Sequence, residues 1–114
     1  MRCKRGPTAR LRAARKAKQG RADQKVYAAV DARDGLRSRY SGIYMGELIH
    51  RHHIVKRRPG NTTLENVISL TQHEHLERIH GLNPTLRLIG NANIDGGVEV
   101  WEKIGGEWTH VRNI

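Results

Sequence analysis

The sequence has few of the residues that build disulfides, apolar segments and large cores: no phenylalanine, one cysteine and three prolines in 114 residues. A single cysteine, Cys3, excludes an internal disulfide and any zinc site made of several cysteines. No apolar run approaches the length of about 20 residues that a membrane-spanning helix needs. No apolar stretch follows the basic N-terminus, as one would in a secretory signal. We therefore expect a cytoplasmic protein with no membrane partner.

Acidic residues are also scarce, because 21 lysines and arginines stand against 11 aspartates and glutamates. The formal net charge of +10 at pH 7 favours a polyanionic partner, such as a nucleic acid or an anionic surface. A chain of 114 residues can form one domain with a modest core.

Residues 1–24 form a basic arm in which Asp23 is the one acidic residue and Leu11 the one large aliphatic residue. Its alanines permit a helix after Pro7, but such a segment cannot bury enough apolar surface to fold alone. The arm is either a solvated tail or a segment that contacts DNA phosphates. The expected phosphate contacts are Arg10, Arg12, Arg15, Lys16 and Lys18.

The segment after the arm predicts one helix followed by two strands. Apolar residues at helical spacing predict a helix over residues 23–33, with Asp23 as its N-cap. Residues 47–55 and Val67–Leu70 predict two strands. The second strand can return beside the first, because the turn-rich loop 56–65 joins them.

A second helix is predicted directly after these strands. Thr71 and Glu74 stand at the spacing of a capping box, in which each side chain bonds the other residue's backbone amide. Gly81 is the expected end of this helix. Leu76 and Ile79 are expected on its inner face.

The last part of the chain, residues 82–114, predicts a short strand at Leu86–Ile89 and a hairpin over 98–112. The two-residue turn Gly105–Gly106 sets the register of this hairpin. Both tryptophans then share one face, which is either an interface for a partner or a cover for the core. The expected cross-strand pairs are Val100 with Val111, Trp101 with His110, and Lys103 with Trp108.

Six of the seven histidines lie between Leu48 and Gly81. His52 and His53 are adjacent in a predicted strand, so their side chains should point to opposite sides of it. One imidazole can then bind a metal ion while the other remains free to accept a proton. Asn66 follows within the same stretch, and His75 comes nine residues after Asn66.

This order and spacing resemble the HNH endonucleases, a family of ββα-metal nucleases. The resemblance implies that His52 and His75 hold one divalent ion, which in this family is often Mg²⁺, Mn²⁺, Ni²⁺ or Zn²⁺. It also implies that His53 is the general base and that Asn66 positions the loop and the base by hydrogen bonds. The residues expected to neutralise DNA phosphates near the scissile bond are Arg51, Lys56, Arg57 and Arg58.

The sequence departs from many HNH proteins at the two CxxC pairs that bind a structural zinc. Ser38 and Ser41 stand at the positions of the first pair, and Thr71 and Glu74 at those of the second. A hydroxyl does not replace a thiolate ligand, so we expect no structural zinc.

Two further histidines lie near the expected metal ligands. A third ligand in some family members lies four residues after the second, where this chain has Ile79. His80 lies five residues after His75, about 500° round a regular helix, and could join the site only if the helix is distorted. His50 shares the strand face of His52 and could support it indirectly.

These patterns predict an α+β fold. It comprises the arm 1–24, a ββα-metal nuclease core over 25–81 preceded by a helix, and the extension 82–114 with its hairpin. The predicted function is metal-dependent hydrolysis of DNA phosphodiester bonds, by nicking or double-strand cutting. The alternatives are a non-catalytic DNA-binding protein on a decayed scaffold of the same kind, and a homodimeric or phage-assembly component. The setting that we expect is intracellular, such as a phage-infected bacterial host.

Overall fold

The computed structural model describes residues 5–114, and its first element is a single helix of 30 residues, α1 (Arg5–Asp34). Residues 1–4 of the expected arm lie outside the described residues. The prediction that a helix begins at Asp23 was wrong, because the arm's alanine, arginine, lysine and glutamine residues favour helix and continue it N-terminally. Asp23 therefore lies mid-helix, where its carboxylate accepts hydrogen bonds from Gln19 and Arg57 instead of capping the helix.

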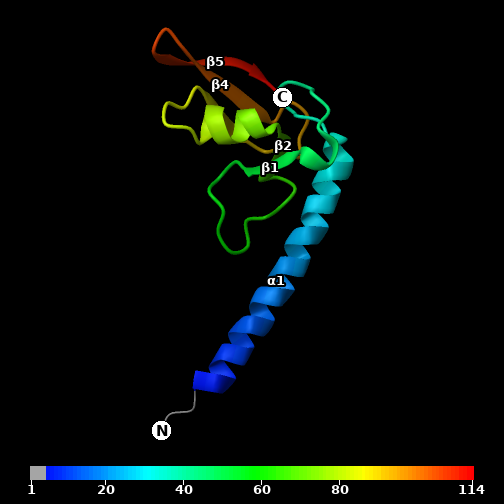
Figure 1. Ribbon diagram of the computed structural model, residues 1–114. Coiled ribbons are helices and arrows are strands. Elements are labelled where there is room, and N and C mark those ends of the chain that lie inside the picture. The colour runs from blue at the N-terminus through cyan, green and yellow to red at the C-terminus, as the bar shows by residue number, and fades with distance from the viewer. Residues whose placement is uncertain (1–4) are drawn as a thin grey trace.

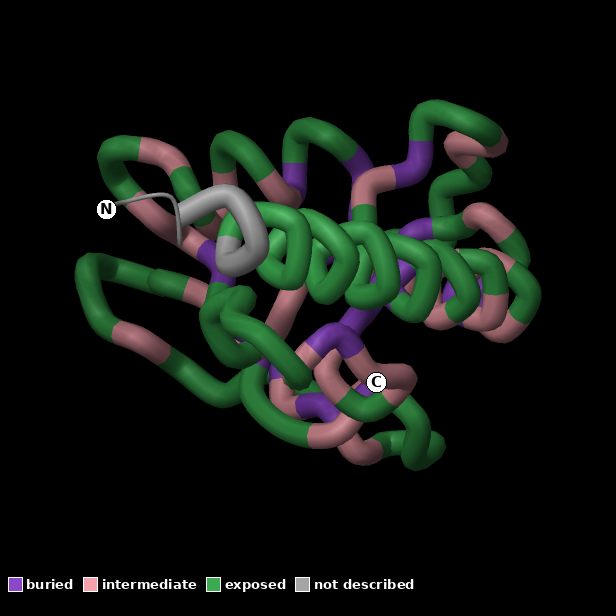
Figure 2. Tube along the Cα trace, turned by 90° about the horizontal axis from the view of Figure 1, so that it is seen from below, coloured by how far each residue is buried: buried purple, intermediate pink, exposed green. Residues whose placement is uncertain are grey.

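The two ends of α1 have different surroundings. Every residue from 9 to 22 is exposed, whereas Val30 near the C-terminal end is fully buried. Figure 1 shows the N-terminal part of the helix projecting away from the sheets, and Figure 2 colours most of its length as exposed. The molecule consequently extends 62 Å along its longest axis and only 31 and 23 Å along the others. Within residues 5–114, no helix has the length and apolarity that crossing a membrane requires.

Two small antiparallel sheets follow α1, which confirms the α+β prediction (Figure 1). The first pairs β1 (His50–His53) with β2 (Val67–Leu70). The second has the strand order β3 (Leu86–Gly90), β4 (Val98–Ile104), β5 (Glu107–Asn113). β1 begins later than predicted because Gly46–Leu48 forms a short 3₁₀ turn, η1. Between the two sheets the chain forms a further short helix, η2 (His73–Ile79).

Both sheets share one apolar core. Ile68 and Leu70 of β2 pack in the same buried cluster as residues of β3 and β4. Thus residues 82–114 pack directly on the ββ unit, and the two sheets are fixed relative to each other by apolar contact. The members of the cluster from the second sheet are Leu86, Leu88, Val98 and Val100, with Ala92 from the connecting loop.

The C-terminal hairpin follows the predicted register over most of its length. The pairs Trp101–His110 and Lys103–Trp108 are confirmed. Gly105 (φ 59°) and Gly106 (φ 83°) both have the positive φ angles that a two-residue turn between twisted strands favours. The prediction that Val100 faces Val111 was wrong: a bulge between residues 100 and 101 shifts the register, so that Val100 faces Arg112.

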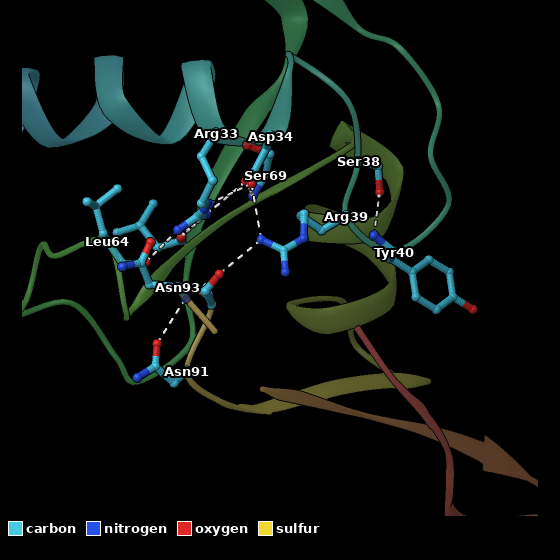
Figure 3. A network of polar contacts seen from close by, with 11 residues as sticks. Arg33, Asp34, Ser38, Arg39, Tyr40, Leu64, Ser69, Asn91 and Asn93 are labelled. Carbon is cyan, nitrogen blue, oxygen red and sulfur yellow. Dashed lines mark hydrogen bonds and ion pairs between the residues drawn. The ribbon is translucent and has the colours of Figure 1, made fainter. Parts of the chain in front are cut away.

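A buried carboxylate joins the end of α1 to the ββ unit. Asp34 accepts hydrogen bonds from Arg33 (2.6 and 2.9 Å), from Arg39 (3.1 Å) and from the backbone amide of Ser69 in β2 (3.1 Å). Figure 3 shows these donors converging on Asp34. The two guanidinium groups also donate to backbone carbonyls, Arg33 to those of Leu64 and Val67 and Arg39 to that of Ala92.

Burial alone would raise the pKa of the Asp34 carboxyl. The hydrogen bonds from Arg33 and Ser69 and the charge of Arg33 outweigh burial, so the pKa lies below its ordinary value of 3.8. The ionised carboxylate therefore stabilises the folded chain. This contribution is present at neutral pH and is lost as the pH falls through the lowered pKa.

We predict that Asp34→Ala lowers the free energy of unfolding by about 3–5 kcal/mol, because the change leaves charged donors and a buried amide without their acceptor. The measurement is urea unfolding at pH 7 and at several acidic pH values. The variant should lack part of the acid-dependent destabilisation of the wild type. Asp95→Ala, which removes an exposed carboxylate, is the control and should be neutral. Equal stability of the two variants would contradict the role assigned to Asp34.

Candidate metal centre

The start of η2 is fixed by the predicted capping box. The Thr71 amide donates to Glu74 Oε1 (3.0 Å) and the Glu74 amide donates to Thr71 Oγ1 (3.1 Å). The buried Glu74 carboxylate also accepts from the Ser38 hydroxyl at 2.5 Å. Ser38 Oγ in turn accepts from the amides of Tyr40 and Ser41 (3.1 Å each). At the positions where the HNH resemblance places cysteines, the chain thus has a network of hydrogen bonds between oxygen and nitrogen atoms.

η2 is wound more widely than the predicted α-helix. It is a π-helix over its whole length, and the His80 amide donates to the carbonyl of His75 at 3.2 Å. Since a π-turn bonds residues five apart, it brings His80 close to His75, whereas a regular α-helix would separate them. The wider winding also turns Leu76 outward. Its exposed fraction is 45%, so the prediction that it lies on the inner face was wrong.

Gly81 ends η2 in a place where a larger residue does not fit. A Cβ atom at this position would lie 2.2 Å from the carbonyl oxygen of Glu77, which is closer than any Cβ contact permits. Because Gly81 directly follows His80, the glycine allows the last wide turn to close where the histidine is placed.

Three histidines from β1 and η2 meet beside this turn. One nitrogen from each of His52, His75 and His80 lies within 4.8 Å of the other two. Bonds of about 2.0–2.1 Å from zinc to imidazole nitrogen require two ligand atoms to lie within about 4.2 Å of each other. Small rotations of the rings would bring any wider pair into this range. The predicted ligands His52 and His75 are therefore brought together, and His80 joins them.

The surroundings of His52 and His75 favour the neutral form of both imidazoles. Burial lowers the pKa of His52 to about 3, and the charge that the neighbouring imidazoles would carry acts in the same direction. Burial likewise lowers the pKa of His75 to about 4. The buried Nδ1 of His52 makes no hydrogen bond to the described part of the chain. Neutral rings with free lone pairs are what a metal ion requires, and an unpaired buried nitrogen is an atom that such an ion would satisfy.

The remaining histidines of this stretch lie outside the cluster. His50 Nδ1 is 3.1 Å from Nδ1 of His75, which leaves Nε2 of His75 free to bind a metal ion. A hydrogen bond of this kind fixes the orientation of a ligating ring. His73 is exposed and bonds Glu77.

His53 lies outside the cluster of three histidines, although it follows His52 directly in β1. Its Nε2 lies 2.9 Å from the Thr62 hydroxyl, and its ring packs edge-on against Tyr27. Burial, followed by the nearby charge of Arg57, lowers the pKa of His53, while Asp23 acts in the opposite direction. At neutral pH His53 is therefore an unprotonated imidazole held by a buried hydroxyl. The sequence drew no attention to Thr62, because its contact with His53 depends on how the loop folds.

Asn66 closes the loop between β1 and β2. Its side chain accepts from the Val55 amide (2.8 Å) and donates to the carbonyls of Val55 and Asn61 (3.0 Å each). Among the described residues, its side chain makes no hydrogen bond to His53. Asn66 thus positions the loop, while Thr62 makes the hydrogen bond to the imidazole.

A cleft of about 810 Å³ contains His53 and the three clustered histidines. Of the four residues near the site that are expected to bind phosphate, Arg51, Lys56 and Arg57 line this cleft and Arg58 lies outside it. Arg51 pairs with Asp31 and Arg57 with Asp23, whereas Lys56 is exposed. The five expected phosphate contacts of the arm, Arg10, Arg12, Arg15, Lys16 and Lys18, are exposed on α1 and do not line the cleft.

Comparison of the chain with protein-family models, with curated proteins and with solved structures found no match.

We predict that His80→Ala weakens binding of Zn²⁺ or Ni²⁺ at least about tenfold. Losing a residue that only hydrogen-bonds a metal ligand already lowers metal affinity by about 10- to 100-fold, and His80 would be a ligand itself. His75→Ala should weaken binding by a similar factor. Isothermal titration calorimetry of the purified variants is the measurement, and His73→Ala is the matched control because His73 lies on the same helix outside the cluster. Wild-type affinity in His80→Ala would remove His80 from the site.

Proposed function

We propose that this chain is a metal-dependent DNA endonuclease of the HNH type. The observation that carries the proposal is the placement of three histidines within 4.8 Å of one another in a basic cleft that His53 also lines. Three protein ligands that leave positions open for water and substrate are typical of catalytic metal sites, whereas structural sites are closed by four. The spacing of His52, His53, Asn66 and His75 supports the same reaction class.

His53 is the general base in this proposal. If the Thr62 hydroxyl accepts a hydrogen bond from Nε2–H, Nδ1 keeps its lone pair and can take a proton from water. The oxygen of that water bonds to phosphorus, and the bond from phosphorus to the 3′ oxygen breaks. A cation held by His52, His75 and His80 would supply positive charge that stabilises the phosphate and the departing oxygen.

The donor set indicates which ions fit. Imidazole nitrogens suit zinc, nickel and similar transition metals, whereas Mg²⁺ prefers oxygen ligands and an octahedral shell. None of the three clustered side chains is a carboxylate. We therefore expect transition-metal ions to bind more tightly than Mg²⁺, whichever ion supports turnover.

The exposed part of α1 is proposed to bind DNA phosphates. Along residues 9–22 the helix carries positive charge and no acidic residue, and all of these residues are exposed. An unpaired basic helix attached to a basic cleft can hold a polyanion at several points at once.

We predict that His53→Ala lowers the rate of metal-dependent cleavage of supercoiled plasmid by about 10²–10⁴-fold, the usual effect of losing a general base. Metal affinity should be retained, because His53 lies outside the metal cluster. Agarose gels of time courses with EDTA, Mg²⁺, Mn²⁺, Ni²⁺ or Zn²⁺ give the rates. Nicking and double-strand cutting are separated by the ratio of open-circle to linear product. Undiminished cleavage by the variant would assign the base elsewhere, and no cleavage by the wild type with any ion would favour a non-catalytic DNA-binding role.

We also predict that changing the five arm residues Arg10, Arg12, Arg15, Lys16 and Lys18 to glutamine flattens the salt dependence of duplex binding. Each lost phosphate contact should reduce the slope of log K against log salt by about 0.9, so the total reduction can reach about 4.5. Fluorescence anisotropy at several salt concentrations is the measurement. A slope equal to that of the wild type would make the exposed half of α1 a passive extension.

A further inference from the structure

We propose that the second wall of the cleft, made by Trp108, Arg87 and Lys103, binds an unpaired nucleotide next to the histidines. The preferred substrate would then be single-stranded or locally unpaired DNA. This inference rests on the proposed function only in taking DNA as the ligand, and it concerns residues for which the HNH resemblance implies no role.

The wall comes from the C-terminal sheet and is distant in sequence from the histidine stretch. Trp108 of β5, Lys103 of β4 and Arg87 of β3 line the same cleft as His53 and the metal cluster. The Arg87 guanidinium carbon lies over the Trp108 ring, 4.2 Å from its centroid, and Lys103 Nζ lies 5.8 Å from the same centroid. One half-buried indole therefore has two positive charges beside it.

The charge of the cleft suits an anionic ligand. Its described lining residues include five lysines and arginines and none that is acidic. Arg51 and Arg57 are held in ion pairs by aspartates, whereas Lys56, Arg87 and Lys103 form no ion pair within residues 9–114. The three free cations lie on both walls, so a phosphodiester strand that passes between the walls would meet positive charge on either side.

The indole favours an unpaired base over a duplex. An aromatic ring binds a nucleobase through the face of the base, and in a duplex the neighbouring base pairs cover those faces. Stacking of one exposed base on an aromatic side chain contributes about 1–3 kcal/mol whatever the base. Both the indole and the flat Arg87 guanidinium offer such a surface, and Arg87 and Lys103 can neutralise the phosphate of the same nucleotide.

Trp101 provides a matched control on the same sheet. It lies on the same outer face as Trp108 but does not line the cleft. Its ring packs against His110 with centroids 5.2 Å apart, and its Nε1 donates to Glu99 at 2.9 Å. A general effect of losing an indole from this sheet should therefore appear equally at both positions, and a stacking effect only at Trp108.

The experiment measures binding in EDTA, so that cleavage plays no part. Fluorescence anisotropy compares fluorescein-labelled single-stranded dT20 with a 20-base-pair duplex for the wild type, Trp108→Leu and Trp101→Leu. We expect Trp108→Leu to weaken binding of dT20 by about 5- to 150-fold, the loss of one stacked base, and to change duplex binding far less. Trp101→Leu should leave both affinities near those of the wild type. Trp108→Phe, which keeps an aromatic face, should retain most of the affinity for dT20.

A second measurement does not depend on the leucine variants folding well. In Trp101→Phe the remaining indole is Trp108, and its fluorescence should be quenched when dT20 is added. In Trp108→Phe the remaining indole is Trp101, and its fluorescence should change little. Equal quenching in the two variants, or equal loss of single-strand and duplex binding in Trp108→Leu, would overturn the inference. Selective stacking at Trp108 without any cleavage by the wild type would uphold the inference and reject the proposed nuclease function.

Discussion

The buried carboxylate of Asp34 is the contact on which the arrangement of the chain depends. It joins the last residue of a 30-residue helix to the backbone of β2, and the arginines that bind it also bond carbonyls before β2 and after β3. β2 holds β1, the strand that carries the paired histidines, and its inner side chains form the core shared with the C-terminal sheet. The ionised Asp34 thus holds α1 against the ββ unit, and the shared apolar core holds the second wall of the cleft against the histidine strand.

The π-helical winding of η2 determines which histidines meet at the cluster. A regular helix would have placed Ile79 near His75 and turned His80 away, and the cluster would then have contained two imidazoles. The π-turn costs ordinary helical hydrogen bonding, and its closure needs a glycine at position 81. The capping box and Ser38 hold the opposite end of η2 through the buried Glu74. Hydrogen bonds at the start and a wide turn at the end therefore present two histidines to the one on β1.

Local patterns in the sequence were sufficient to predict much of this arrangement. Strand alternation separated His52 from His53, the Thr71–Glu74 spacing predicted the cap, and Gly105–Gly106 predicted the hairpin turn. The missed features depend on other principles. The helix propensity of the arm residues extends α1 through the arm. A bulge changes the cross-strand partner of Val100 from Val111 to Arg112. His80 belongs to the cluster because η2 is a π-helix. A prediction based on the α-helical period of 3.6 residues per turn places His80 on another face than His75. The contacts of Thr62 and Trp108 depend on tertiary packing, which no local spacing encodes.

We propose that β1 and η2 together form one metal centre. The most direct test is anomalous diffraction at the nickel or zinc absorption edge, from crystals of the full chain grown with the ion. We expect a single strong peak about 2.0–2.1 Å from one nitrogen of each of His52, His75 and His80, with open coordination positions facing the cleft. Absence of a peak at this cluster, or a peak bound by η2 alone without His52, would contradict it.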